Sequence, residues 1–302
     1  MRQPIEPDPG NSGVGNGLRN RSRLSMLLPP KVENKMTNIA LTIAGSDSGG
    51  GAGIQADLKA MSALGVYGAS VITAVTAQNT KSVTAVHGIP LDVVEAQIGA
   101  VLSDLDVKAI KIGMLATPEI IQTVATALEG FSGPIVLDPV MIAKSGDALL
   151  AEEAVTTLRD VLVPRATVLT PNLPEAGCFL GAVSAATPDE MIEQGNNLCN
   201  LGAKAVLMKG GHANGEICHD ILIEGGKVVG EYTAKRRDTK NTHGTGCTLS
   251  SSIAACLAKG LQLNDAVEEA HTYLQNAIAV ADDLNVGQGH GPVHHFHAFW
   301  KA

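Results

Sequence analysis

Aromatic residues are scarce in this sequence, and their scarcity limits how a core can be built. Phe, Trp and Tyr together account for 3% of the 302 residues, whereas hydrophobic residues account for 45%. A chain of this length can form one large domain or two small ones. We therefore expect a sizeable interior made of aliphatic side chains and alanine.

Three further absences exclude classes of protein. The five cysteines show no C-x-x-C spacing, which argues against a zinc knuckle or a disulfide framework and favours a reducing, cytoplasmic setting. No stretch approaches the roughly 18 apolar residues of a membrane span, so we expect no membrane partner. The net charge of −8 argues against a nucleic-acid partner, because phosphate backbones attract clustered Lys and Arg.

Residues 1–35 differ in composition from the rest of the chain. Proline, glycine, asparagine and serine are frequent among them, and such a composition buries too little apolar surface to fold. We expect a disordered N-terminal extension over 1–35, or a start assigned too early, with Met36 as the working start. A transit peptide, suggested by the arginines of 19–23, is the less favoured alternative.

From residue 38 onwards, short β-branched segments alternate with segments of helical periodicity. Strands are expected at 38–44, 71–77, 83–89, 107–112, 135–137, 167–170 and 204–208, with a hairpin at 217–223 and 227–232. Helices are expected after Gly53 and at 92–105, 118–128, 151–162 and 265–284. This alternation is typical of an α/β fold in which helices cover both faces of a mainly parallel sheet.

The stretch 241–247 is glycine-rich and leads into an apolar helical pattern. A helix that begins near Gly246 directs its free N–H groups and its positive dipole end at Gly244, Thr245, Gly246 and Cys247. Such a place binds anions, above all phosphate. We expect the same field to acidify the thiol of Cys247. The alternative is a glycine-rich loop that merely caps a buried helix.

Polar residues follow strand after strand, at the edge where open α/β sheets bind ligands. They are the loop 45–53, Gln78, Met114, Asp138, Asn172, Glu175, Lys209 and the loop 244–247. The loop 45–53 is not a P-loop, because no Gly-Lys-Ser/Thr closes it.

Two carboxylates and a lysine at this edge suit phosphoryl transfer from a magnesium nucleotide. Asp138 and Glu175 are candidate Mg²⁺ ligands, directly or through water. Lys209 and the loop amides would neutralise charge on the moving phosphoryl group. Alternatively, Asp138 is a turn residue before Pro139, and Glu175 is a first-turn helix acid.

Several motifs resemble those of the hydroxymethylpyrimidine/phosphomethylpyrimidine kinases. They are 45–59, 111–115, 138–146, 170–176, 208–212, 241–247 and 291–297, so the resemblance extends over about residues 38–300. It implies a ribokinase-like kinase domain over 36–302. It also implies two ATP-dependent steps of thiamin biosynthesis, which convert 4-amino-5-hydroxymethyl-2-methylpyrimidine to its monophosphate and then to the diphosphate.

The resemblance implies roles for individual residues. The substrate pyrimidine is expected near Gly45, Ala52, Asp57, Gln78, Met114 and Val140. Magnesium ATP is expected on Asp138, Asn172, Glu175, Lys209 and Thr242. Cys247 stands where ribokinase-like sugar kinases carry an aspartate base, so it is expected to accept the alcohol proton, with Lys209 as its catalytic partner. Relatives of this kind are commonly homodimers.

Other readings remain open. A pyridoxal-type vitamin kinase on the same fold is the main alternative, because pyridoxal shares a hydroxymethyl group on an aromatic nitrogen ring. A non-catalytic ligand-binding protein is a third possibility. The histidine-rich tail 291–297 suits either a metal site or, as we prefer, a docked amphipathic tail.

Overall fold

The computed structural model describes residues 36–141, 152–212 and 215–300. The chain divides into a unit Met1–Met36, which lies almost wholly outside these residues, and a folded unit Thr37–Ala302. The expected extension over 1–35 and the motif residues 143–146 therefore lie outside the described residues. All that follows concerns the folded unit.

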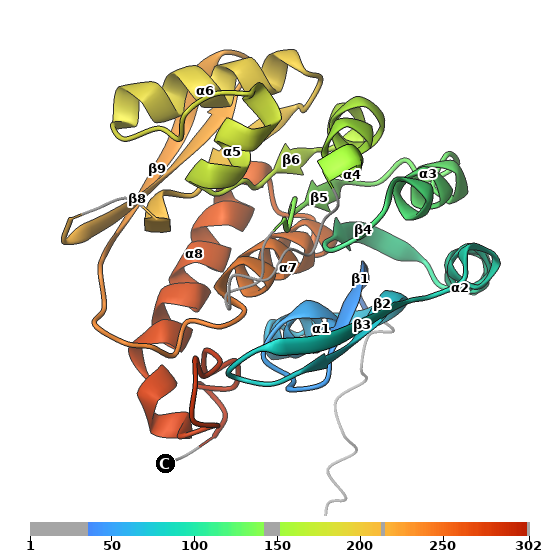
Figure 1. Ribbon diagram of the computed structural model, residues 1–302, viewed down its shortest axis with the longest axis horizontal. Coiled ribbons are helices and arrows are strands. Elements are labelled where there is room, and N and C mark those ends of the chain that lie inside the picture. The colour runs from blue at the N-terminus through green and yellow to red at the C-terminus, as the bar shows by residue number, and fades with distance from the viewer. Residues whose placement is uncertain (1–35, 142–151, 213–214, 301–302) are drawn as a thin grey trace, which may run out of the picture. The chain divides into compact units, whose positions relative to one another are not determined.

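The folded unit is built around one sheet, whose nine described strands follow the order β3-β2-β1-β4-β5-β6-β7-β8-β9 (Figure 1). The strands are β1 Ile39–Asp47, β2 Tyr67–Gln78, β3 Val83–Gly88, β4 Val107–Ile112, β5 Ile135–Leu137, β6 Val168–Leu169, β7 Ala205–Met208, β8 Ile217–Glu224 and β9 Lys227–Lys235. Neighbours from β2 to β7 pair in parallel, whereas β3, β8 and β9 each join antiparallel to the strand before them. The expected mainly parallel sheet is confirmed.

Helices cover both faces of this sheet. They are α1 Gly53–Ala63, α2 Leu91–Asp104, α3 Pro118–Ala127, α4 Glu152–Thr157, α5 Leu173–Leu180, α6 Pro188–Asn200, α7 Thr245–Ala258 and α8 Leu263–Ala279. Helices α1, α7 and α8 pack together on one face, and α2 to α6 lie on the other (Figure 1). The sequence therefore predicts the layer architecture correctly.

The core is aliphatic, as the composition requires. Leu41 and Ile43 of β1 face the layer of α2 to α6, and the preceding Ala40 faces α1 and α7. This alternation follows from the two-residue period of a strand. On the second face, small residues such as Ala254 and Ala270 are fully buried, which lets α7 and α8 pack closely.

Local sequence signals fix several helix starts. Thr117 accepts a hydrogen bond from the Ile120 N–H, and Pro118 occupies the first position of α3. Helices α5 and α6 begin with reciprocal capping boxes headed by Asn172 and Thr187.

Several expected boundaries are wrong, among them the start of β2, which lies at Tyr67 and not at residue 71. Strand β1 continues to Asp47 through a register irregularity between Ala44 and Ser46, because Ser46 and Asp47 remain paired with β2. The helix expected over 151–162 is α-helical only to Thr157 and continues as a π-helical turn, Leu158–Leu162. The last expected helix stops at Ala279, and a separate 3-10 turn covers Ala281–Leu284.

Within the described ranges, no helix combines the length and the apolar character that a membrane crossing requires.

Candidate active site

The polar strand ends meet where the strand order reverses. β1 lies between β2 and β4, so the loops that follow β1 and β4 diverge to opposite faces of the sheet. Open α/β sheets bind their ligands at such a switch point. β9 runs parallel to β7, because each is antiparallel to β8, so the carboxyl end of β9 lies at this same edge.

The glycine-rich stretch 241–247 forms the N-terminus of α7, as expected. Gly244 caps the helix with a left-handed backbone, φ 78°, and has no side chain with which to bond the first-turn amides. A Cβ atom at Gly244 would collide with the carbonyl oxygen of Gly51. A Cβ atom at Gly246 would lie 3.5 Å from both Asp138 Oδ2 and Lys209 Nζ. The free helix end therefore faces this charged pair.

Asp138 and Lys209 form an ion pair at the ends of β5 and β7. Lys209 Nζ lies 2.9 Å from Asp138 Oδ1, and the Ser250 hydroxyl donates to Oδ2 at 3.2 Å. The carboxylate is almost fully buried. Burial raises the pKa of Asp138, but the charges of Lys209 and Lys111 outweigh it and hold the pKa below its ordinary value. The site thus keeps a negative charge beside a paired positive one.

Asn172 and Glu175 join this cluster through the start of α5. The Asn172 N–H donates to Glu175 Oε2 at 2.8 Å, and the Glu175 N–H donates to Asn172 Oδ1 at 2.9 Å. Burial raises the pKa of Glu175, and the charge of Lys209 opposes this. The backbone of Asn172 also forms an isolated parallel β-bridge with the backbone of Lys209. The helix-acid interpretation of Glu175 is confirmed, and its role toward a metal stays a prediction.

The prediction of an acidified Cys247 is wrong. Its half-buried thiol lies in the first turn of α7, close enough to Lys111 and Asp138 to feel both charges. Burial raises the pKa of Cys247 to about 11, although Lys111 and the Gly53 N–H oppose the change. The loss of hydration and the negative charges of Asp57 and Asp138 outweigh these two groups, so Cys247 is a neutral thiol at pH 7.

Asp57, which is expected near the pyrimidine, is paired with a buried lysine, and its role in substrate binding stays a prediction. Its side chain is fully buried, and Oδ2 accepts from Lys111 Nζ at 2.8 Å and from the Thr42 hydroxyl at 2.6 Å. Burial raises the pKa of Asp57, and Lys111 opposes this. The structure thus gives Asp57 a supporting position behind the site, because α1 carries it inward against β4.

The remaining residues expected near the pyrimidine are two members of the loop 45–53, Gly45 and Ala52, and three residues outside it, Met114, Gln78 and Val140. A Cβ atom at Gly45 would contact the Met114 side chain, which is itself buried. Gln78 and Val140 are half-buried, and the Val140 N–H donates to the Asp138 carbonyl at 2.9 Å. Ala52 adjoins Gly51, against which Gly244 packs. Thr242 accepts a 3.4 Å bond from the Thr245 N–H through its carbonyl.

Sequence reasoning missed two residues, Asp47 and His243. Asp47 Oδ2 accepts hydrogen bonds from the Gly51 N–H at 3.0 Å, the Ala52 N–H at 2.8 Å and His243 Nε2 at 2.9 Å. Burial raises the pKa of Asp47, but these hydrogen bonds outweigh burial and hold the pKa below its ordinary value. An aspartate that precedes several glycines is a known signal for side-chain bonds to a turn. His243 carried no comparable signal.

The histidine-rich tail docks against the same region. Val293 is fully buried, and His294 and His295 are buried beside it. The His243 N–H donates to the Gly291 carbonyl at 3.0 Å, which ties the tail to the loop 241–247. The docked-tail interpretation is confirmed.

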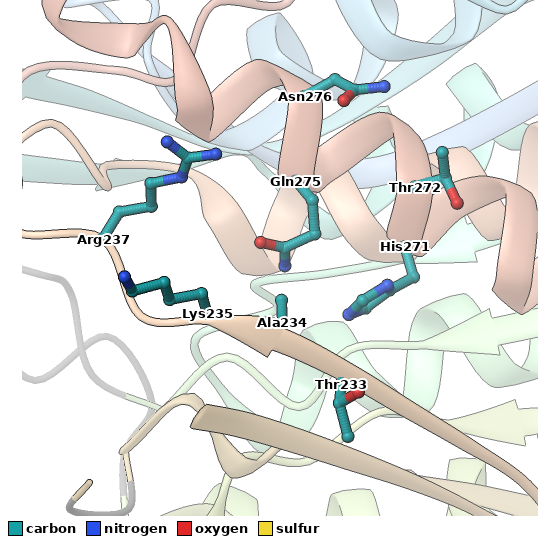
Figure 2. Close-up of a pocket in the computed structure, with 8 residues that line it drawn as sticks. All are labelled: Thr233, Ala234, Lys235, Arg237, His271, Thr272, Gln275 and Asn276. Atoms are coloured by element: carbon teal, nitrogen blue, oxygen red, sulfur yellow. The ribbon is translucent and has the colours of Figure 1, made fainter. Parts of the chain in front are cut away.

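A separate pocket opens between β9 and α8, with a volume of about 320 Å³ (Figure 2). Figure 2 shows Lys235 and Arg237 on one side of it and His271 and Gln275 of α8 on the other. Burial lowers the pKa of His271, and the charge of Asp220 opposes this. The pocket lies at the carboxyl end of β9, just before the chain enters the loop 241–247.

Known proteins resemble this chain over the whole folded unit. A family model described as phosphomethylpyrimidine kinase matches residues 47–294. The hydroxymethylpyrimidine/phosphomethylpyrimidine kinase of Rhizobium meliloti (strain 1021) is 56% identical over 266 residues, which span 88% of this chain and 100% of that protein.

Solved structures agree. The ADP complex of Bacillus subtilis pyridoxal kinase matches with a TM-score of 0.80 at 36% identity, covering 88% of this chain and 100% of that one. The phosphomethylpyrimidine kinase of Clostridium difficile 630 matches with a TM-score of 0.70 at 46% identity, covering 80% and 99%. The chain therefore belongs to the phosphomethylpyrimidine kinase family and has the ribokinase-like fold.

Proposed function

We propose that the protein transfers the γ-phosphoryl group of ATP to the hydroxymethyl oxygen of 4-amino-5-hydroxymethyl-2-methylpyrimidine. In a second turnover it phosphorylates the resulting monophosphate, as thiamin biosynthesis requires. The observation that carries this proposal is the Asp138–Lys209 pair in front of the free N-terminus of α7. A lysine and unpaired helix amides together stabilise negative charge on a phosphoryl group in transfer.

In the first step the hydroxymethyl oxygen attacks the γ-phosphorus. A new oxygen–phosphorus bond forms while the bond from the γ-phosphorus to its bridging oxygen breaks, and ADP leaves. The thiolate form of Cys247 receives the hydroxyl proton, and the thiol so formed returns that proton to solvent. Lys209 and the amides of Gly244, Thr245, Gly246 and Cys247 neutralise the charge on the phosphoryl oxygens.

The carboxylates of Asp138 and Glu175 suit a magnesium ion, which prefers hard oxygen ligands. Asp138 already accepts bonds from Lys209 and Ser250, and Glu175 from the Asn172 N–H, so contact through water fits these residues best. Bound magnesium would neutralise phosphate charge. Asn172 and Thr242 would complete the polar rim around the phosphates.

The pocket of Figure 2 offers a place for the adenosine of ATP. It lies at the same sheet edge as the α7 N-terminus, and residues 236–243 connect the two. Lys235 and Arg237 would lie on the phosphate side of such a ligand, since the chain runs from them toward Gly244.

The aminopyrimidine ring is proposed to bind between the loop 45–53 and the chain after β4. Gly45, Ala52, Met114 and Val140 supply apolar and backbone surface there. Gln78 supplies a side-chain amide, which can pair with a ring nitrogen and an amino group at once.

Pyridoxal is the second candidate substrate. The similarity to Bacillus subtilis pyridoxal kinase, with a TM-score of 0.80, favours it, but the 56% identity to a hydroxymethylpyrimidine/phosphomethylpyrimidine kinase favours the pyrimidine.

A coupled ADP-release assay with the pyrimidine, its monophosphate and pyridoxal in parallel tests the proposal. We expect turnover of both pyrimidines and a kcat/KM for pyridoxal at least about tenfold lower, because an amide placed for one ring discriminates against another. Preference for pyridoxal would replace the proposal by its alternative. An absence of ADP release with all three would contradict both.

We also propose that the protein is a homodimer of the cytoplasm. Edge strand β3 exposes Val86, and Val75 and Val93 nearby are exposed as well, so the edge is apolar and suited to association. The described cysteines are all free, which fits a reducing compartment. Sedimentation velocity at micromolar concentration should give a dimer, and a monomer there would contradict the assembly. Cell fractionation tests the compartment.

A further inference from the structure

His243 lies where the segments on both sides of the site meet. Its Nε2 atom is 2.9 Å from Asp47 Oδ2, and its backbone pairs with Pro292 of the tail. Its ring packs so closely on Gly51 that a Cβ atom at Gly51 would overlap it. The next residue, Gly244, touches the Gly51 carbonyl and begins the cap of α7. His243 therefore belongs to the phosphate-facing loop 241–247 and bonds to the loop 45–53.

The proton on this histidine can be assigned. Asp47 is ionised, because its net pKa lies below the ordinary value, and a carboxylate only accepts hydrogen bonds. His243 Nε2 must therefore carry the hydrogen that it shares with Asp47. The same Asp47 oxygen orders the Gly51 and Ala52 amides, so one carboxylate connects His243 to the backbone of the loop 45–53.

The hydrogen on His243 Nε2 also determines the orientation of the Gln78 side-chain amide. Gln78 Nε2 lies 3.3 Å from His243 Nε2, and Gln78 Oε1 lies 3.2 Å from the Thr76 hydroxyl oxygen. A nitrogen that donates to Asp47 offers no lone pair, so a hydrogen bond between Gln78 and His243 requires the amide oxygen on the His243 side. The oxygen and nitrogen of an amide are assigned from the hydrogen-bond network, so we infer that the amide is turned end for end. Its nitrogen then faces the Thr76 hydroxyl, which already gives its own hydrogen to the Ser46 carbonyl at 3.0 Å. His243 thereby selects which end of the Gln78 amide points in each direction.

We propose that His243 is a positioning residue that holds the pyrimidine-side loop 45–53 in register with the phosphate-side loop 241–247. This inference rests on the proposed function, in which one loop carries the attacking oxygen and the other carries the phosphoryl group. Transfer depends steeply on the distance and alignment of these two atoms. Binding of each ligand to its own loop does not depend on that alignment.

Replacement of His243 by Leu and by Gln tests the proposal, because Gln retains a terminal N–H donor. For His243→Leu we expect kcat of the first step to fall by about 10²-fold, with the KM values for ATP and pyrimidine changed less than about threefold. His243→Gln should recover most of the loss. The control is His219→Leu, which removes a His–carboxylate pair of the same length, 2.9 Å to Glu231, on the β8–β9 hairpin.

A kcat for His243→Leu equal to that of the wild type would overturn the proposal. So would an equal loss in the Leu and Gln variants, or a fall in Tm with unchanged kcat. Hydrogen exchange gives a readout that needs no turnover: His243→Leu should speed exchange in both loops, and His243→Gln should not. If the wild type releases no ADP, the proposed function fails, and the exchange result alone decides the role of His243.

Discussion

At the scale of the residue, Cys247 is the chemically unusual group. A cysteine at a helix N-terminus is ordinarily acidified, but burial raises the pKa of this one to about 11. A thiolate with a high pKa is a strong base that is rarely populated at pH 7. In the proposed mechanism this thiolate accepts the proton late, once the bond to phosphorus is largely made, which a loose transition state allows.

The two phosphorylation steps should depend on Cys247 to different extents. The first nucleophile is an alcohol that must lose a proton, whereas the second is a phosphate oxygen, already ionised because its second pKa is about 6. Cys247→Ser should therefore lower kcat/KM of the first step by about 10²-fold or more and of the second by less than about tenfold. Step-resolved product analysis measures both rates on one enzyme preparation.

The pH profile provides the matching control. In the wild type the first step should accelerate as pH rises from 7 toward the pKa of about 11, because the fraction of thiolate grows. In Cys247→Ser this dependence should disappear. Equal losses in the two steps, or an unchanged profile in the variant, would remove Cys247 from proton transfer.

Site residues could be predicted from the sequence where neighbouring residues in the chain determine their position, and not where distant segments do. Asp138 and Lys209 follow obvious strands, so the rule for strand ends was enough to place them together, as the 2.9 Å pair confirms. The pKa of Cys247 was predicted in the wrong direction, because its burial and the charge of Asp57, which both raise it, depend on segments far away in the chain. The Asp47–His243 bond joins residues that only the fold brings together.

At the scale of the element, a buried ion pair joins α1 to β4 beneath the site. Both side chains of Lys111 and Asp57 are fully inaccessible, with a separation of 2.8 Å. Burial lowers the pKa of Lys111, but the charge and hydrogen bond of Asp57, together with other negative groups such as Asp138, outweigh burial and raise the pKa overall. Such a pair can contribute little net stability, yet removal of one partner leaves the other charge buried and unpaired.

Lys111→Met should therefore lower the free energy of unfolding by about 3–5 kcal/mol, measured by urea denaturation. Adding Asp57→Asn to that variant should restore part of the loss, since the charge left behind is removed. Lys259→Met is the matched control, because its 2.6 Å pair with Glu269 is partly exposed and should be worth less than about 1 kcal/mol. Losses of similar size for the two lysines would contradict the account of the buried pair.

Element boundaries were predicted well wherever a regular pattern ends at a strong signal. β4 and β5 have the predicted limits, because apolar runs there end at Gly113 and at Asp138 before Pro139. β1 was predicted too short, since glycine in its last residues suggested a turn while neighbouring strands kept it extended. Tertiary pairing overrides local preference in that case.

At the scale of the whole molecule, the strand order decides where chemistry can occur. The reversal at β1 and the return of β9 to the parallel direction bring the loops 45–53, 138–141, 209–212 and 236–247 to one edge. The chain carries a net charge of −8, yet Lys209 and the α7 N-terminus supply an ammonium group and N–H donors at that edge. A phosphorylated ligand can therefore be attracted locally by an acidic protein.

The central claim is that the phosphoryl group is transferred at the N-terminus of α7. A crystal structure with a non-hydrolysable ATP analogue and the pyrimidine tests it most directly. We predict that the terminal phosphate accepts hydrogen bonds from the Gly246 and Cys247 amides and from Lys209, with the hydroxymethyl group in line behind it. A terminal phosphate bound elsewhere, with these amides facing water, would contradict the claim.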